Sequence, residues 1–147
     1  MDKGVAVAVA AAIGGVVAAQ APLNSQLGRA VGGLQASVVA LAVSFVAVLV
    51  LAALTDGLGG LRRIGDAPLH VAIGGGLVGA LYVGSIVFTV RALGAGGLTA
   101  LTIAGQLGLA MVIDHFGWLG VERSPITAAK LAGVVLLALG TWLVIRE

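Results

Sequence analysis

The sequence predicts an all-α integral membrane protein with five transmembrane helices. Five stretches, each almost free of charge, have the length of about 20 residues that a helix needs to cross a hydrocarbon core of about 30 Å. Hydrophobic residues make up 60% of the chain and charged residues 10%, whereas an ordinary soluble domain has about 25% charged residues. A backbone in lipid must satisfy its own hydrogen bonds, which favours helices for spans of this length. We expect one domain, residues 1–147, with helices at approximately 4–27, 34–54, 71–90, 97–113 and 126–145.

The first span carries two carboxamides around a proline. Gln20 and Asn24 are four residues apart and therefore share a helix face. Pro22 has no N–H to donate to the carbonyl group of Ala18, so it leaves a free acceptor where the helix can kink.

Glycine and proline mark the limits of the other spans. A short connection through Gly32 and Gly33 leads to the second span, and the longest loop lies between Thr55 and Leu69. A cluster of glycines separates the third span from the fourth. Pro125 suits the start of the fifth helix, because its missing N–H would be unpaired there in any case.

Further polar side chains lie inside the spans at helical spacing. Tyr82 and Ser85 share a face of the third span, and Thr102 and Gln106 share a face of the fourth. Such groups are costly against lipid, so we expect them to face the bundle interior or a wet cavity. For serine and threonine, interhelical or own-helix hydrogen bonding is the simpler interpretation. The predicted substrate-binding residues are Gln20, Asn24, Tyr82, Ser85, Thr102, Gln106 and Trp118.

Asp114 is the acidic residue that adjoins the core of a span, and it is the candidate for coupling transport to protons. A coupling role would require desolvation of its carboxyl group. The alternative is an interfacial position beside His115, at the end of the fourth helix.

Small residues are expected to let the helices approach one another. The chain has 24 glycines, and in lipid close backbone packing replaces much of the hydrophobic effect. These glycines could pack helices within one chain or form a seam between two copies. The predicted helix-packing residues are Gly75, Gly79, Gly133 and Gly140.

Basic residues are nearly balanced between the two sides of the predicted bundle. Orientation in the membrane depends mainly on this bias, and a weak bias permits insertion both ways. Two oppositely oriented copies would then form the inverted repeat on which many transporters are built. One side carries Lys3, Arg62, Arg63, Arg123 and Lys130 if it snorkels that way, and the other carries Arg29, Arg91 and Arg146.

Several functions find no support in the residues. The chain has no cysteine, so disulfides and thiol chemistry are excluded. Its two histidines, His70 and His115, lie in separate loops, and no catalytic constellation is present. We therefore expect no enzyme, metal site or cofactor. The scattered basic residues form no run, so we expect no nucleic-acid partner.

Two segments resemble the YdcZ-like family of five-helix proteins, within the drug/metabolite transporter superfamily. They are Gln20-Ala-Pro-Leu-Asn24-Ser-Gln-Leu-Gly28-Arg29, and Gly105-Gln106-Leu with Ile113-Asp114-His115-Phe116-Gly117. The resemblance covers approximately residues 5–145. It implies two five-helix units in antiparallel arrangement, as a homodimer or with an oppositely oriented homologue. Four-helix multidrug relatives use a glutamate in their first helix to couple protons, and this chain has none there.

We expect a transporter of a small polar or amphipathic metabolite in the bacterial cytoplasmic (inner) membrane. It would be one half of an antiparallel ten-helix dimer and would work by alternating access, with Gln20, Asn24 and Gln106 of both copies at the site. Tyr82 and Trp118 would form walls of that site. Its partners would be lipid, the second copy and the solute. Two alternatives stay open: a passive small-solute or ion channel, and a structural subunit of a membrane complex.

Overall fold

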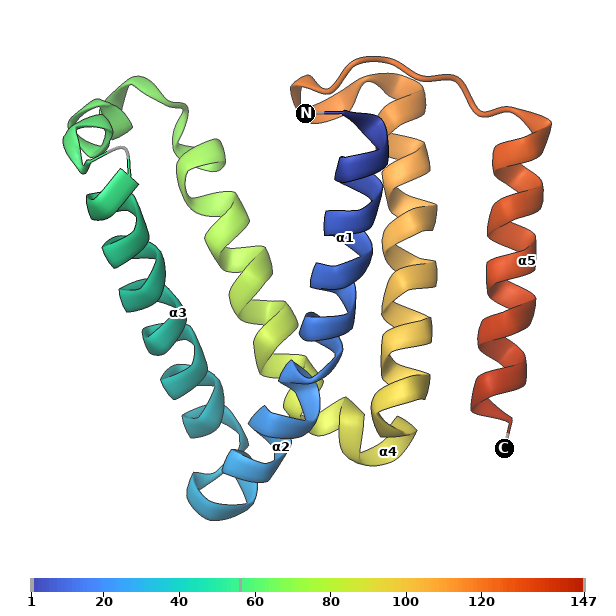
Figure 1. The fold of residues 1–147 in the computed structure, drawn as a ribbon, viewed down its shortest axis with the longest axis horizontal. Helices are drawn as coiled ribbons and strands as arrows, with labels where there is room; N and C mark the ends of the chain where they lie inside the picture. Colours follow the sequence, from blue (N-terminus) through green and yellow to red (C-terminus); the bar gives the residue numbers. More distant parts are fainter. Residues whose placement is uncertain (1, 56, 147) are drawn as a thin grey trace. The chain divides into compact units, whose positions relative to one another are not determined.

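The computed structural model describes residues 2–55 and 57–146, and this part of the chain contains helices and no strand (Figure 1). The prediction of an all-α protein is confirmed for the described residues. The helical elements are α1 (Lys3–Ala18), α2 (Gln20–Val31), α3 (Gly33–Thr55), the short 3₁₀ helix η1 (Gly59–Asp66), α4 (Leu69–Phe116), the 3₁₀ turn η2 (Trp118–Gly120) and α5 (Ala128–Ile145).

The first predicted span consists of two helices, α1 and α2, that meet at Ala19. The backbone N–H of Ala19 donates to the carbonyl oxygen of Val16 at 3.1 Å, which is the tighter pattern of a 3₁₀ turn. The interruption lies three residues before Pro22. It follows from the proline, because Pro22 cannot donate to the carbonyl of Ala18.

The third and fourth predicted spans appear as one element, α4, whose helical backbone is broken at a single residue. Gly94 has φ 68° and ψ 172°, a conformation open to glycine and strained for other residues. A straight helix of 48 residues would be about 72 Å long, more than twice the hydrocarbon thickness of about 30 Å. We therefore count residues 69–93 and 95–116 as two separate crossings.

Four helical segments in the described part are long and apolar enough to cross a membrane. With α4 counted twice at Gly94, they correspond to the five predicted crossings. The last helix begins at Ala128, a little later than predicted, because the hydroxyl of Thr127 accepts a hydrogen bond from the N–H of Lys130 at 3.3 Å and caps it. The four segments are Lys3–Val31, Gly33–Thr55, Leu69–Phe116 and Ala128–Ile145.

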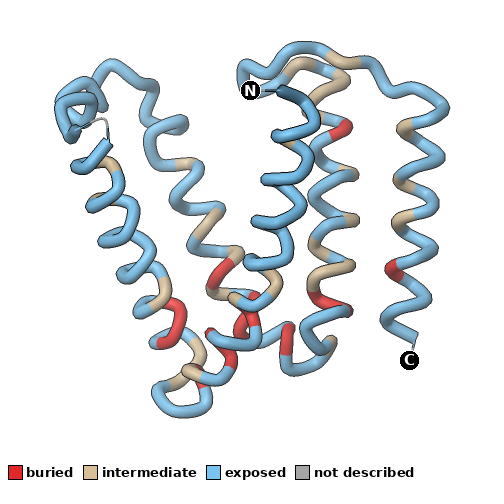
Figure 2. Tube along the Cα trace, in the orientation of Figure 1, coloured by how far each residue is buried: buried red, intermediate tan, exposed pale blue. Residues whose placement is uncertain are grey.

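The chain forms two compact units, Met1–Ala92 and Leu93–Glu147. In the first unit, buried residues gather where α2 and the start of α3 lie against the later turns of residues 69–92 (Figure 2). Ile86 and Val87 are its most deeply buried large side chains. In the second unit, α5 is joined to α4 by a hydrogen bond from the Thr141 hydroxyl to the carbonyl oxygen of Ala100, at 3.2 Å.

Candidate functional site: a buried polar face of α2

One face of α2 is buried and carries polar groups. Its buried residues follow the i, i+3, i+4, i+7 spacing of a single helix face, and they are Ala21, Asn24, Ser25 and Gly28. A Cβ atom on Gly28 would lie 3.0 Å from Cγ1 of Val87 in α4. The absence of a side chain at Gly28 therefore brings the two helices close together, and it fixes this face of α2 against α4.

Asn24 lies on this face, and its amide nitrogen lacks a hydrogen-bond partner in the described part of the chain. The residue is 8% exposed, and the Nδ2 atom is buried without a hydrogen-bond partner among the described residues. A buried donor with no acceptor costs about 1–3 kcal/mol. Such a group is rare in a folded protein and requires a reason beyond packing. This is the most informative polar atom in the first unit.

Two other polar groups lie near this face: Gln20 belongs to α2 itself, and Arg91 belongs to α4. Gln20, four residues before Asn24, is half-buried and belongs to the same helix. At the other end, a guanidinium nitrogen of Arg91 would be 3.3 Å from a Cβ atom on Gly28. Arg91 thus lies over the face of α2 that carries Asn24, about one helical turn away.

Ser37 fixes α3 beside this face. Its hydroxyl lies 3.2 Å from the carbonyl oxygen of Val83 in α4 and 3.2 Å from that of Gly33 in its own helix, and it can donate to either. A methyl group on Gly33 would lie 2.9 Å from the ring of Phe88. The sequence patterns did not single out Gly28 and Gly33 as packing residues, because Gly28 was expected near the end of the first span and Gly33 in the short connection after it.

The other predicted site residues of the first unit are less enclosed. Tyr82 is half-buried. Ser85 is exposed, and its hydroxyl donates to the carbonyl oxygen of Tyr82 at 2.9 Å, within the same helix. The simpler interpretation of a serine inside a span, a bond to its own backbone, therefore describes Ser85.

In the second unit, Gln106 is exposed on α4, on the surface of the single chain. Thr102 is half-buried, and its hydroxyl lies 3.0 Å from the carbonyl oxygens of Leu98 and Thr99 in its own helix. Thr141, which is 5% exposed, makes the interhelical bond of this unit. No sequence pattern distinguishes Thr141, because it stands alone in an apolar stretch of its helix.

The last turn of α4 and the segment after it contain the other two predicted residues. Asp114 is half-buried, and its backbone carbonyl oxygen accepts a hydrogen bond from the N–H of Ser124 at 2.8 Å. Trp118 is 53% exposed and stacks on Phe116, with ring centroids 5.1 Å apart. The imidazole of His115 accepts a hydrogen bond from the backbone N–H of Ile126 at 3.3 Å through its Nδ1 atom.

The predicted helix-packing glycines have no close neighbour within the chain. A Cβ atom on any of them would meet nothing within 4 Å among the described residues. Their small faces are therefore free in the single chain. These residues are Gly75, Gly79, Gly133 and Gly140.

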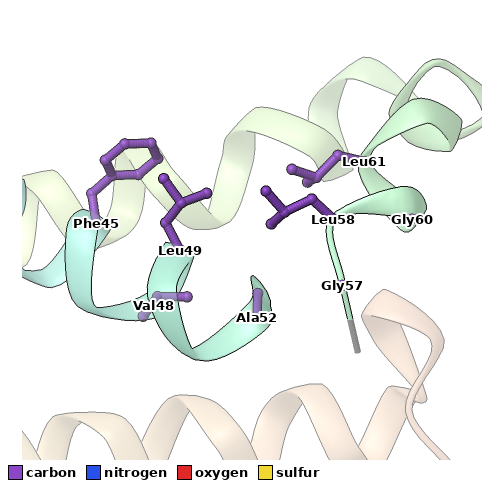
Figure 3. A pocket seen from close by; sticks show the side chains of 8 residues that line it. All are labelled: Phe45, Val48, Leu49, Ala52, Gly57, Leu58, Gly60 and Leu61. Atoms are coloured by element: carbon purple, nitrogen blue, oxygen red, sulfur yellow. The ribbon is translucent and has the colours of Figure 1, made fainter. Parts of the chain in front are cut away.

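An apolar hollow of about 350 Å³ lies between the end of α3 and the loop that holds η1 (Figure 3). A site for a polar solute needs a few polar groups to orient it. The side chains here are aliphatic or aromatic, so this hollow suits a hydrocarbon chain better than a polar solute. Its lining residues are Phe45, Val48, Leu49, Ala52, Gly57, Leu58, Gly60 and Leu61.

The described residues contain no group of three or more His, Cys, Asp or Glu placed to hold a metal ion.

Comparison with known proteins gives the family. The protein-family model described as "Putative inner membrane exporter, YdcZ" matches residues 5–143, nearly the whole chain. Searches of curated proteins and of solved structures found no match. The matched range includes both segments that carry the resemblance, and the apolar helices have the length that an inner-membrane protein requires. The chain belongs to the YdcZ family of inner-membrane exporters and is a membrane transporter.

Proposed function

We propose that this protein exports a small polar or amphipathic metabolite by alternating access, as an antiparallel homodimer in which Asn24 binds the solute. The observation that carries the proposal is the Nδ2 atom of Asn24, which is buried without an acceptor. Polar groups inside membrane helices are costly and mark transport pathways. A transporter recovers that cost when a solute, or the other conformation, supplies the missing acceptor.

The first span, which carries Asn24, is interrupted, and such an interruption supports a change of conformation during transport. Transporters commonly bind their solutes where a membrane helix is discontinuous. The first span is interrupted at Ala19, just before Gln20 and Asn24, and α4 is interrupted at Gly94. Both interruptions provide positions where helices can rotate while the binding residues stay attached to rigid segments.

Two features of the single chain support a dimer. The first is the free faces of the helix-packing glycines, which would allow close contact with a second copy. The second is the near balance of basic residues, which permits both orientations.

Other predicted residues complete the proposal. Gln106 and Thr102 of the second unit would line the pathway in the dimer, with Tyr82 and Trp118 as walls. Asp114 is the candidate for proton coupling, because it is a half-buried acidic residue at the end of a span. An Asp114→Asn variant would then lose transport driven by a pH gradient and keep exchange of solute across the membrane.

The test is a solute panel in liposomes that contain the purified protein, with and without a pH gradient. We expect saturable transport of at least one small polar solute, and a loss of at least tenfold in Asn24→Leu. Gln26→Leu is the matched control, because Gln26 is exposed on the same helix. Normal transport by Asn24→Leu would contradict the proposed site. Fast, non-saturating flux would indicate a channel instead.

Orientation is tested separately by labelling. The chain has no cysteine, so single cysteines introduced at Gly65 and at Arg146 report on the two membrane faces without background. A dual-topology dimer predicts that each position is labelled from both sides in intact cells. Labelling of each position from one side only would rule out the antiparallel homodimer.

A further inference from the structure

We propose that the exported solute is a small organic anion, with its carboxylate held by the guanidinium of Arg91 and a second oxygen held by the amide of Asn24. This inference rests on the proposed function and names its substrate class. It starts from the placement of two groups of hydrogen-bond donors on one face of α2.

The two donor groups lie against the same stretch of α2, one at Asn24 and the other at Gly28. Gly28 follows Asn24 by four residues, so their backbones lie about 6 Å apart along the axis of α2. Arg91 reaches over Gly28 because that position has no side chain; a guanidinium nitrogen would be 3.3 Å from a Cβ atom there. A spacing of about one helical turn matches a small molecule with oxygens at both ends.

The chemistry of both groups requires an acceptor. A guanidinium has five N–H donors and no acceptor, and its fork matches a carboxylate in a bidentate manner. The Nδ2 atom of Asn24 is likewise a donor, and it lacks a partner. Within residues 2–55 and 57–146, Arg91 forms no ion pair or hydrogen bond through its side chain. Both groups therefore lack an acceptor among the described residues: the buried amide nitrogen of Asn24 and the exposed side chain of Arg91.

The charges along the spans disfavour a cation. Residues 3–55 and 67–113 contain no aspartate or glutamate, so a cationic solute on this face of α2 would have no counter-charge. Moving a charge out of water is costly unless it is paired. The acids of the first unit that the structure describes, Asp2 and Asp66, lie before α1 and in η1. An anion, in contrast, would pair with the positive charge of Arg91.

A lipid phosphate could offer Arg91 the same chemistry as a solute carboxylate, so the experiment separates the two. Liposomes of phosphatidylcholine alone, and of phosphatidylcholine with phosphatidylglycerol, are loaded with succinate, its diamide or 1,4-diaminobutane. These probes share a four-carbon chain and differ in charge. Efflux is measured for the wild type, Arg91→Gln, Arg91→Lys and Arg29→Gln. Arg29 is the matched control, an exposed arginine next to Gly28.

We expect saturable efflux of succinate at least tenfold faster than of the diamide or the diamine, in both lipid mixtures. Arg91→Gln should lower succinate efflux at least tenfold, Arg91→Lys should retain a part of it, and Arg29→Gln should stay within twofold of the wild type. Succinate should also raise the unfolding temperature of the wild type in detergent and not that of Arg91→Gln, a readout independent of transport.

Other outcomes overturn the inference. If the diamine or the diamide leaves faster than succinate and this efflux depends on Asn24, the proposed function is kept. The assignment of an anionic substrate is then rejected. An effect of Arg91→Gln seen only with phosphatidylglycerol would make Arg91 a lipid anchor. The solute panel described for the proposed function gives a separate outcome. If no solute in that panel is transported while circular dichroism shows that the protein is folded, the proposed function itself is contradicted.

Discussion

A methyl group on Gly28 of α2 would lie 3.0 Å from Cγ1 of Val87, and Val87 is fully buried in α4. Gly28 is therefore a point of close approach between the helix that carries Asn24 and the helix that carries Arg91. Because Val87 is fully buried, this contact constrains how the two helices pack at the candidate site.

Gly28→Ala should destabilise the protein. Overpacking of a well-filled core costs about 1–3 kcal/mol, which exceeds the gain of about 1 kcal/mol in helix propensity. Thermal unfolding in detergent measures the effect. Gly15→Ala in α1 is the control, since its Cβ would meet nothing within 4 Å. Equal unfolding temperatures for the two variants would mean that α2 and α4 do not pack this tightly.

Asn24→Leu should leave the stability unchanged or raise it, although transport is lost. Leucine has a similar size and removes a buried donor whose unpaired state costs about 1–3 kcal/mol. Chemical or thermal unfolding of the detergent-solubilised protein gives the sign of the change. A clear loss of stability would show that the amide has a partner in the resting state, and the site would lose its main support.

Thr141→Val should weaken the packing of α5 on α4 by roughly 0.6 kcal/mol, the average for an interhelical hydrogen bond in a membrane protein. The hydroxyl that is lost donates to Ala100 at 3.2 Å. Thr102→Val is the matched control, because the Thr102 hydroxyl bonds its own helix. The two variants are compared by thermal unfolding, and a larger loss for Thr102→Val would reverse this assignment.

His115→Phe should loosen the segment from Gly117 to Thr127. Phenylalanine keeps the contact with Phe116 and removes the Nδ1 acceptor for the N–H of Ile126. Limited trypsin digestion should therefore cut after Arg123 several-fold faster. His70→Phe, at the start of α4, controls for the loss of a histidine. Unchanged cleavage would show that the hydrogen bond does not hold this segment.

Gly79→Leu should leave the unfolding of the single chain nearly unchanged and weaken dimer formation. A side chain at this position meets no atom of its own chain within 4 Å, whereas it would collide with a closely packed second copy. Crosslinking in the membrane measures the dimer. A dimer that forms as well as in the wild type would place the interface on another face.

The sequence alone determined the features that depend on local composition. Apolar runs without charge are enough to predict helices that cross a bilayer, and Pro22 and Gly94 act on the backbone where they stand. The family followed from the segments around Asn24 and Gln106. Each of these signals is readable without knowing which residues meet in space.

Tertiary structure decided which of several similar residues is buried. Asn24 and Gln106 are both carboxamides inside spans, and only Asn24 is buried in the chain. Gly75 and Gly79 form a recognisable repeat, yet Gly28 and Gly33 are the glycines whose Cβ atoms would crowd a neighbouring helix. Burial and close contact depend on residues far away in the sequence, so no local pattern contains them. Helix packing distinguishes one amide and these two glycines among candidates that the sequence cannot rank.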